Sequence, residues 1–541
     1  MSEEKVLTKE ISEGIIMYNS VFLYLDEFTQ IDDQAAEVLA KRQGVLSLSG
    51  LTELSDNAAE SLSKHKGSLG LDGLNELSDA AAESLAKNPN ALSLSLNGLT
   101  ELSDAAAEIL AKFQGATLRL SGLTELSDAA AESLSKYQGG TLSLFGLAEL
   151  SDAAAESLSK FKGATLDLNG LTELSDAVAE SLAKYKGYLR LNGLTELSDA
   201  VAENLSTHKG PQFDFPNLTE LSDAAAESLS KYKGGSLNLS GLTELSNSCA
   251  AALAKYQGRL NLTGLTELSD AAAESLSEYK GAGLALTGLT ELSDTAAESL
   301  AKFKGELSLE GLTELSAAVA ESLSTHKGSC FDFPNLTELS DAAAESLSKY
   351  KGGSLNLDGL TELSDAAAES LSKNEGDSLS LDGLTELSDA AAESLAKFKG
   401  ADLILNYNGA YCFKWLSDIA SEFLSNFKGN ISYENPKEWV KAFASKIHIK
   451  VKSDPEMILN SESKWGFEKI YEVDAQINGK VIRFRQHQTE KFGEFYFYDT
   501  QSNKFETISS LKNGQLIKEC LDSDGGIDFL NKGDEWDEYF G

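Results

Sequence analysis

The chain has 541 residues, and 46 Lys and Arg against 85 Asp and Glu give it a formal net charge of -39. That charge argues against a protein that binds nucleic acid or an anionic membrane, because both partners require a surplus of basic residues. Four scattered cysteines with no Cys-x-x-Cys spacing exclude a disulfide scaffold and a cysteine-rich zinc module, and they fit a reducing compartment.

The first 20 residues differ in sequence from residues 21–429 and are predicted to form an N-terminal cap. They contain no basic segment followed by an apolar run, so we expect no ordinary secretory signal. A membrane-spanning helix needs about 18 consecutive apolar residues, and the sequence has no such stretch. These features favour a cytoplasmic protein, with non-classical secretion left open.

Residues 21–429 repeat one short motif in about 17 units. The motif Leu-Thr-Glu-Leu begins at Leu51 and returns, with small changes, every 23 to 25 residues as far as Leu384. A divergent first copy begins at Phe28, and a degenerate last copy runs from Leu403. A period of this size is typical of a solenoid, in which each unit buries its apolar face only by stacking on its neighbours.

The first half of each unit is predicted to be a strand and a turn. In residues 117–121 polar and apolar side chains alternate, so Leu118 and Leu120 are expected to point inward. Gly122 then permits a sharp turn, and Leu123 and Leu126 are expected to add two more inward side chains.

The second half of each unit is predicted to be a short helix. Ser127 or Asp128 can cap its free N–H groups, and the Asp charge suits the positive end of the helix dipole. Ala130, Leu134 and Tyr137 come next at helical spacing, which places them on one buried face.

The Leu-x-Leu strand followed by Gly-Leu-Thr-x-Leu-Ser-Asp resembles the leucine-rich repeat family and is most similar to its short bacterial members. The resemblance implies a horseshoe with a parallel sheet on the concave face and helices on the convex face. Strand spacing of about 4.8 Å against helix spacing of roughly 8–10 Å favours the same curvature. Family members usually have Asn where this chain has Gly; Asn217 and Asn335 restore it. Glycine suits the turn but supplies no side-chain bonds.

Most concave positions carry small uncharged residues, so the exceptions define a candidate partner-binding patch. It contains Arg119, Phe145, Asp167, Tyr188, Arg190, Asp214 and Arg259. Tyr and Arg dominate interface energetics, and Asp167, Arg190 and Asp214 come from consecutive units, which predicts a charge ladder. Neutral drift with a self-paired ladder is the alternative. We predict that Arg190→Ala and Tyr188→Ala weaken partner binding without unfolding the array.

A longer period lies inside the short one. His208 and the segment Phe-Asp-Phe-Pro-Asn at residues 213–217 return 118 residues later as His326 and residues 331–335. This offset equals five units and indicates that a block of the array was duplicated.

Residues 430–541 lose the repeat and become rich in aromatic residues, which predicts a separate small α+β domain with an acidic tail. Asn478-Gly479 between two strand-like segments predicts a hairpin with a type I′ turn. A second hairpin is expected over residues 494–508, and a helix is expected to begin at Pro436.

Three motifs in this domain have residue types that can perform chemistry, and a non-catalytic interpretation is favoured for each. His487 with Glu490, and His448 further away, could provide acid–base chemistry but lack a nucleophile motif. Cys520 stands in a Cys-x-Asp motif, which also occurs in some bacterial leucine-rich-repeat ubiquitin ligases; we expect an ordinary buried thiol. Residues 522–528 alternate carboxylates as calcium loops do, but Gly533 replaces the twelfth-position Glu. We therefore predict no catalytic residue, metal or cofactor.

The sequence favours a non-catalytic scaffold that binds a protein partner on its concave face. The C-terminal domain would cap the open end or provide a second interaction site, with Trp415 and Phe423 sealing the last leucines. The alternative is an effector or toxin-like protein whose residues 430–541 carry an activity that the repeats target. A surface adhesion protein is a third possibility, disfavoured by the lack of a signal, and self-association is left open.

Overall fold

The computed structural model describes residues 5–16 and 20–405, Leu424, and strands between residues 430 and 506. The chain divides into two parts. The first comprises residues 1–335 and 349–353, and the second comprises residues 336–348 and 354–541.

The first part repeats a short strand, a turn and a helix of about two turns. Its strands are β1 (Val6–Leu7), β2 (Phe22–Tyr24), β3 (Gln30–Ile31), β4 (Gln43–Ser47), β5 (Lys66–Gly70), β6 (Ser93–Ser95), β7 (Thr117–Arg119), β8 (Thr141–Ser143), β9 (Thr165–Asp167), β10 (Tyr188–Arg190), β11 (Gln212–Asp214), β12 (Ser236–Asn238), β13 (Arg259–Asn261), β14 (Gly283–Ala285), β15 (Glu306–Ser308) and β16 (Cys330–Asp332). Its helices are α1 (Lys9–Ile15), α2 (Asp33–Leu39), α3 (Asp56–Leu62), α4 (Asp79–Ala86), α5 (Asp104–Leu110), α6 (Asp128–Leu134), α7 (Asp152–Leu158), α8 (Asp176–Leu182), α9 (Asp199–Ser206), α10 (Asp223–Leu229), α11 (Asn247–Leu253), α12 (Asp270–Ser277), α13 (Asp294–Leu300) and α14 (Ala317–Ser324).

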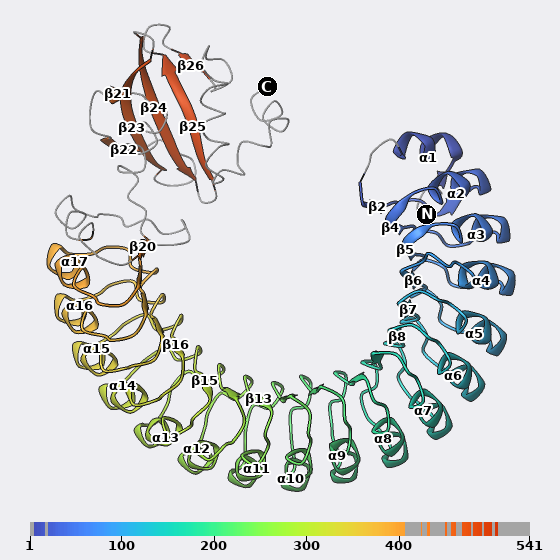
Figure 1. The fold of residues 1–541 in the computed structure, drawn as a ribbon, viewed down its shortest axis with the longest axis horizontal. Helices are drawn as coiled ribbons and strands as arrows, with labels where there is room; N and C mark the ends of the chain where they lie inside the picture. The colour runs from blue at the N-terminus through green and yellow to red at the C-terminus, as the bar shows by residue number, and fades with distance from the viewer. Residues whose placement is uncertain are drawn as a thin grey trace. The chain divides into compact units, whose positions relative to one another are not determined.

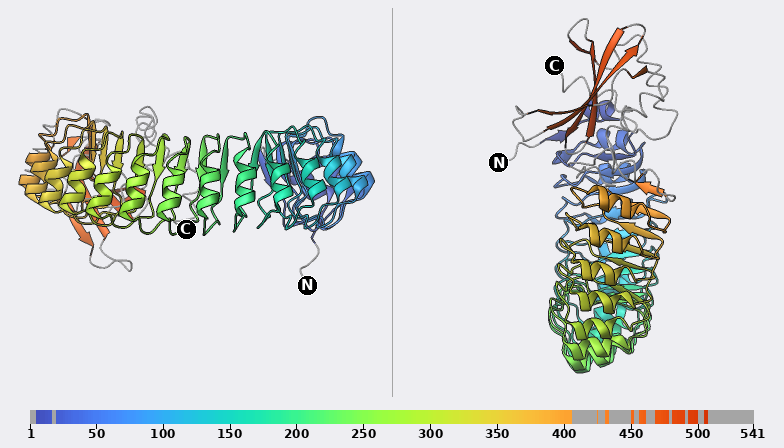
Figure 2. Two further views of the ribbon diagram at one scale, coloured as in Figure 1. Left: turned by 90° about the horizontal axis from the view of Figure 1, so that it is seen from below. Right: turned by 90° about the vertical axis from the view of Figure 1, so that its left-hand side faces the viewer.

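Strands of consecutive units pair in parallel and in one register. Thr117, Leu118 and Arg119 of β7, for example, lie opposite Thr141, Leu142 and Ser143 of β8. In the first part the strands follow the inner side of a curved stack and the helices lie outside them, side by side in one layer (Figures 1 and 2). The predicted α/β solenoid with parallel strands and flanking helices is therefore confirmed at the level of its repeating unit.

The core of each unit is formed by the side chains that the sequence pattern places inward. Leu118, Leu120 and Leu123 are fully buried, as are Leu134 and Tyr137. Leu126, just before the capping serine, is only half-buried, whereas the equivalent Leu197 and Leu315 are buried. Two adjacent buried alanines face the core from most helices, as Ala130 and Ala131 do from α6, so the helix can lie close to the strand layer.

The start of most of these helices also binds the unit before it. The Ser127 hydroxyl accepts a hydrogen bond from the Ala130 N–H at 3.0 Å and donates its own proton to the Asp104 carboxylate of the preceding unit. Ser151 repeats both bonds with Ala154 and Asp128. The serine thus caps the helix while the aspartate accepts from the next serine, and the two residues together join one unit to the next.

A stack of aromatic rings runs through the array behind the strands. Tyr137 stacks between Phe113 and Phe161 at centroid distances of 6.3 and 6.0 Å. Its buried hydroxyl donates to the Gly115 carbonyl of the preceding unit at 2.7 Å. The ring is therefore packed on both sides, and the phenol is satisfied by backbone of a neighbouring unit.

The second part begins with the same kind of unit and ends with antiparallel strands. Its elements are α15 (Asp341–Leu347), β17 (Ser354–Asn356), α16 (Asp365–Leu371), β18 (Ser378–Ser380), α17 (Asp389–Leu395), β19 (Asp402–Ile404), β20 (Asn430–Ser432), β21 (Lys450–Val451), β22 (Glu456–Asn460), β23 (Glu468–Ile477), β24 (Lys480–Thr489), β25 (Phe492–Asp499) and β26 (Lys504–Glu506). Strands β17 to β20 pair in parallel, whereas β21 to β26 pair antiparallel.

The pairing of Ile477 with Lys480 has the register expected for the predicted hairpin at Asn478-Gly479. The helix expected from Pro436, the acidic tail and the sealing residues Trp415 and Phe423 lie outside the described residues. The small α+β domain and the boundaries at residues 20 and 429 therefore stay predictions.

Candidate functional site

The strand face of the first part is interrupted twice. Within a sheet, the backbone N–H of the residue that follows one strand donates to the carbonyl of the last residue of the next strand. The Leu168 N–H, for example, donates to the Arg190 carbonyl at 3.0 Å. No such bond joins Leu191 to Asp214 or Leu309 to Asp332 in the described part of the chain. Accordingly β10 ends one eight-stranded sheet, and the five-stranded sheet of β11 to β15 ends before β16. We call these two junctions, β10/β11 and β15/β16, the interrupted seams.

Each interrupted seam precedes a unit that has Asn in place of the turn glycine. At the equivalent Gly193 an added Cβ would lie 2.0 Å from the Asn169 carbonyl oxygen of the preceding unit. Asn217 carries a Cβ, so its unit cannot approach the preceding one as closely as a glycine unit does. Its side-chain N–H instead donates to the Asn192 carbonyl at 2.9 Å, and Asn335 donates to the Glu310 carbonyl at 2.8 Å.

Side chains bridge the first interrupted seam where the backbone does not. The Tyr188 hydroxyl of β10 donates to the Asp214 carboxylate of β11. The Gln212 side-chain amide donates to both of these groups, at 2.9 Å to the Tyr188 oxygen and 2.8 Å to the carboxylate. Burial first, and then the Asp214 carboxylate, raise the pKa of Tyr188, so its phenol stays protonated as the donor.

Arg190 lies beside this bridge and completes only half of the predicted charge ladder. Its guanidinium carbon is 5.1 Å from the centre of the Tyr188 ring, a cation–π geometry. One guanidinium nitrogen is 4.0 Å from the Asp167 carboxylate, at the outer limit of an ion pair. Asp214 is held by Tyr188 and Gln212 instead of by Arg190. The expected Asp–Arg–Asp ladder is therefore an Asp–Arg pair next to a Tyr–Asp–Gln cluster.

Arg259 is paired within the array. It shares its register position with Gly283 and Glu306 of the next two strands. Because Gly283 has no side chain, Arg259 extends past it and pairs with Glu306 at 2.8 Å. Both side chains are more than half exposed, so the pair contributes little to stability, but it neutralises the cation locally.

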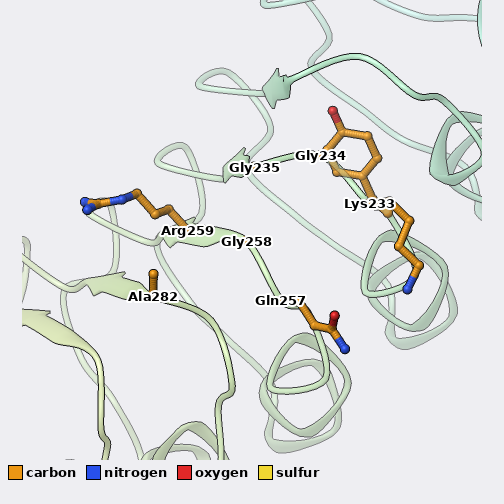
Figure 3. Close-up of a pocket in the computed structure, with 8 residues that line it drawn as sticks. Lys233, Gly234, Gly235, Gln257, Gly258, Arg259 and Ala282 are labelled. Carbon is orange, nitrogen blue, oxygen red and sulfur yellow. The ribbon is translucent and has the colours of Figure 1, made fainter.

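A shallow cavity of about 350 Å³ lies at the start of strands β12 to β14. Tyr232, Lys233, Gln257, Arg259 and Ala282 line it with three glycines. Arg259 and Lys233 extend in opposite directions from it (Figure 3), so their charges do not converge on one ligand.

The side chains of Arg119 and Phe145 are exposed on the strand face. Arg119 is exposed on β7 between Ser95 and Ser143, and it has no ion-pair partner among the described residues. Phe145 follows β8 one unit further along, and its side chain is 51% exposed. A cation and an aromatic ring therefore stand free on a face of small polar residues.

Two exposed aromatic residues at the beginning of this face were not among the residues predicted from the sequence. Phe22 and Tyr24 of β2 are 57% and 65% exposed, and they share register positions with Val45 and Ser47. The signal was present, because Phe22-Leu23-Tyr24-Leu25 has the x-Leu-x-Leu pattern of most later strands. The turn that follows this strand differs from the Gly-Leu-Thr-Glu-Leu turn of later units, so the strand was not aligned with theirs.

The described residues contain no group of three or more His, Cys, Asp or Glu that could hold a metal ion. Burial raises the pKa of the Cys249 thiol to about 11, which keeps it protonated and unreactive. His448, His487 and Cys520, the candidates for chemistry, lie where no side chain is described. Across the described ranges, no helix combines the length and apolar character needed to cross a bilayer.

No protein-family model matches this chain, and no curated protein matches it significantly.

Proposed function

We propose that this chain is a leucine-rich-repeat scaffold that binds a protein partner on the strand face of its first part. The resemblance to that family is supported by the Leu-x-Leu strands, the turn glycines and the parallel register from unit to unit. The partner surface is supported mainly by Arg119 and Phe145, whose side chains are exposed on the strand face.

The other members of the predicted patch have a different role in this proposal. Tyr188, Asp214 and Arg259 are bonded within the array, so they shape the surface and set its charge. Arg119 and Phe145 contribute the binding contacts, because Arg and aromatic side chains are enriched among the residues that dominate the energy of protein interfaces.

The experiment is a comparison of the full chain with the double variant Arg119→Ser/Phe145→Ser. These substitutions install the residue types already found at Ser95 and Ser121, the equivalent positions of the preceding unit, so the fold is expected to persist. Both proteins are used as bait in one lysate, and captured proteins are quantified by mass spectrometry.

The expected result is at least one protein that the full chain retains and the double variant loses. Lys136→Ser, on the helix side, serves as the control and is expected to capture the same protein as the full chain. Equal capture by the full chain and the double variant would remove this surface from consideration.

The effector alternative rests on the domain predicted for residues 430–541. It would be favoured if the full chain were toxic to cells and if Cys520→Ser or His487→Gln abolished toxicity while capture through Arg119 and Phe145 persisted.

A further inference from the structure

The two interrupted seams each have a buried histidine beside them. His208 and His326 occupy the position that Tyr or Phe fills in the aromatic stack of neighbouring units, and their side chains are 1% and 2% exposed. Both are followed by a unit with two phenylalanines in its strand. The same arrangement thus occurs twice, 118 residues apart.

The ring of His208 is enclosed by other rings and lacks a partner for one nitrogen. It lies 6.4 Å from the Tyr185 ring and 5.0 Å from Phe213 of β11 across the first interrupted seam. Its Nε2 has no hydrogen-bond partner. One titratable group packs directly against the histidine, the Tyr185 phenol, whose ring stacks on it. On the other side of Phe213 lies the Tyr232 phenol, which is itself influenced by Tyr188 and Asp214. No carboxylate among the described residues bonds to the ring.

His326 has the same surroundings at the second interrupted seam. It lies 6.4 Å from Phe303 and 5.3 Å from Phe331 of β16, and neither ring nitrogen has a hydrogen-bond partner. The Tyr350 ring packs against Phe331 at 4.9 Å, and burial first, and then Cys330 and Asp332 of the strand, raise the pKa of the Tyr350 phenol.

His65 provides a comparison within the same array. It is 1% exposed at the equivalent position, but β4 and β5 on its two sides are fully paired. Its Nε2 is 3.1 Å from the Gly44 carbonyl, which is the bond that a tyrosine hydroxyl makes in other units. Like His208, His65 has one ring nitrogen without a hydrogen-bond partner and a pKa that burial lowers, so the intact seam beside it is the difference that the comparison isolates.

Desolvation is the largest influence on both seam histidines. It lowers the pKa of His208 and of His326 below the usual 6.5, although nearby backbone carbonyls partly oppose the shift. Because its pKa is lowered in the folded state, each histidine is neutral in the closed seam, and it contributes its full stability to that closed state above pH 6.5. That contribution is lost as the pH falls through the folded-state pKa.

We propose that the two Phe-Asp-Phe-Pro-Asn units are acid-sensitive hinges, in which protonation of His208 and His326 opens the array at β10/β11 and β15/β16 while the other seams stay closed. An imidazolium buried among aromatic rings without a counter-charge is unfavourable. Because these seams already lack the backbone bond that joins other units, opening them is the least costly way to hydrate the charge.

The second interrupted seam should open at higher pH than the first. The positions equivalent to Tyr188, Gln212 and Asp214 are Glu306, Cys330 and Asp332, and no hydrogen bond like the Tyr188–Asp214 bond joins them in the described structure. The spacing is also wider there. A Cβ on Gly328 would be 3.7 Å from the Gly305 carbonyl, whereas one on Gly210 would be 2.6 Å from the Gly187 carbonyl.

Hydrogen–deuterium exchange of the full chain tests the proposal, with rates corrected for the intrinsic pH effect. Between about pH 7.5 and 5.5, amides of β11 and β16 and of the residues before them are expected to exchange about tenfold faster, whereas amides of β8 and β13 should change little. The double variant His208→Tyr/His326→Tyr, which restores the usual stack residue, is expected to abolish the difference. The matched control His65→Tyr is expected to leave it intact.

Two outcomes would overturn the proposal: equal acceleration in all strands, or an acid response that persists in the double variant. If that variant does not fold, His208→Phe and His326→Phe are tested singly, and each must remove the response at its own seam alone. Imidazole titration by NMR provides an independent reading. The signals of His208 and His326 must titrate over the pH range in which the seams open, and a different range for either histidine contradicts the hinge.

Discussion

The Tyr188 hydroxyl donates to the Asp214 carboxylate across the seam where β10 and β11 belong to different sheets. A side-chain bond therefore stands where a backbone bond is missing. In the sequence both residues stand out as partner contacts because they are large or charged on a face of small residues. Their bond gives them a structural role that the sequence alone did not reveal.

Tyr188→Phe should destabilise the first interrupted seam. It removes the donor to a charged acceptor, and such a bond contributes about 1–3 kcal/mol to the free energy of unfolding. The measurement is urea denaturation followed by circular dichroism. Tyr24→Phe is the control, because the Tyr24 side chain is mostly exposed and should change stability by less than about 0.5 kcal/mol. Equal effects of the two variants would contradict a structural role for the Tyr188 hydroxyl.

Tyr137 allows the ring and the hydroxyl of the aromatic stack to be tested separately. Tyr137→Phe keeps the ring, as Phe113 and Phe161 do, and loses one buried hydrogen bond, so it should cost about 0.5–1.5 kcal/mol. Tyr137→Ala also leaves a cavity between two rings and should cost about 3–5 kcal/mol. Chemical denaturation of both variants gives the two values, and a similar loss for both would show that the ring adds nothing.

Gly139 and Gly140 are neighbours with opposite expected tolerance. A Cβ on Gly139 would lie 2.0 Å from the Tyr137 hydroxyl oxygen and 2.5 Å from the Gly115 carbonyl, so Gly139→Ala should cost about 1–3 kcal/mol or more. On Gly140 the nearest atom would be 3.4 Å away, and Gly140→Ala should change stability by less than about 1 kcal/mol. Thermal unfolding of the pair measures the difference, and the reverse order would refute this packing.

Ser151→Ala removes a helix cap and an inter-unit bond together, and should cost about 0.5–2 kcal/mol. Asp128→Asn should be milder than Asp128→Ala. Asn247 already accepts from Ser269 at 2.6 Å in the same position, so an amide oxygen can replace the carboxylate. Denaturation midpoints of the three variants provide the ranking.

The same bonds predict a response at low pH. Hydrogen bonds from Ser246 and then Cys249 lower the pKa of Asp223 below 3.8. The ionised form therefore favours the folded state above that value, and the benefit is lost as the pH falls through the lowered pKa. A pH series of unfolding midpoints for Asp223→Asn and the unchanged chain should converge in strong acid. Midpoints that stay equally far apart would show that Asp223 contributes no pH-dependent stability.

The repeating unit could be predicted from sequence because its signals are local. Alternation around Leu118 marked the strand, and Ser127 with Asp128 marked the helix start. The interrupted seams could not be predicted, although Asn217 and the two phenylalanines of its strand were visible. Whether a Cβ fits at a turn depends on its distance to a carbonyl one unit away, which no pattern within the unit contains.

The candidate site was predicted less well for the same reason. Residue type separated Arg119 and Phe145 from the small polar background. Residue type could not separate them from Tyr188 or Arg259, because only the structure shows that the side chains of those two residues are bonded to Asp214 and Glu306. Arg259 reaches Glu306 across two strands because Gly283 intervenes, and this combination has no signature in any single unit.

The serine–aspartate bonds and stacked rings connect each copy only to the adjacent copies, and most junctions are chemically interchangeable. Genetic recombination between copies can therefore lengthen or shorten the protein by whole units while the new junction is already suited to both of its sides. The junctions at His208 and His326 do not share this freedom. Each needs a particular sequence on both flanks, so a duplication preserves such a junction only when it copies the histidine and the phenylalanine segment together.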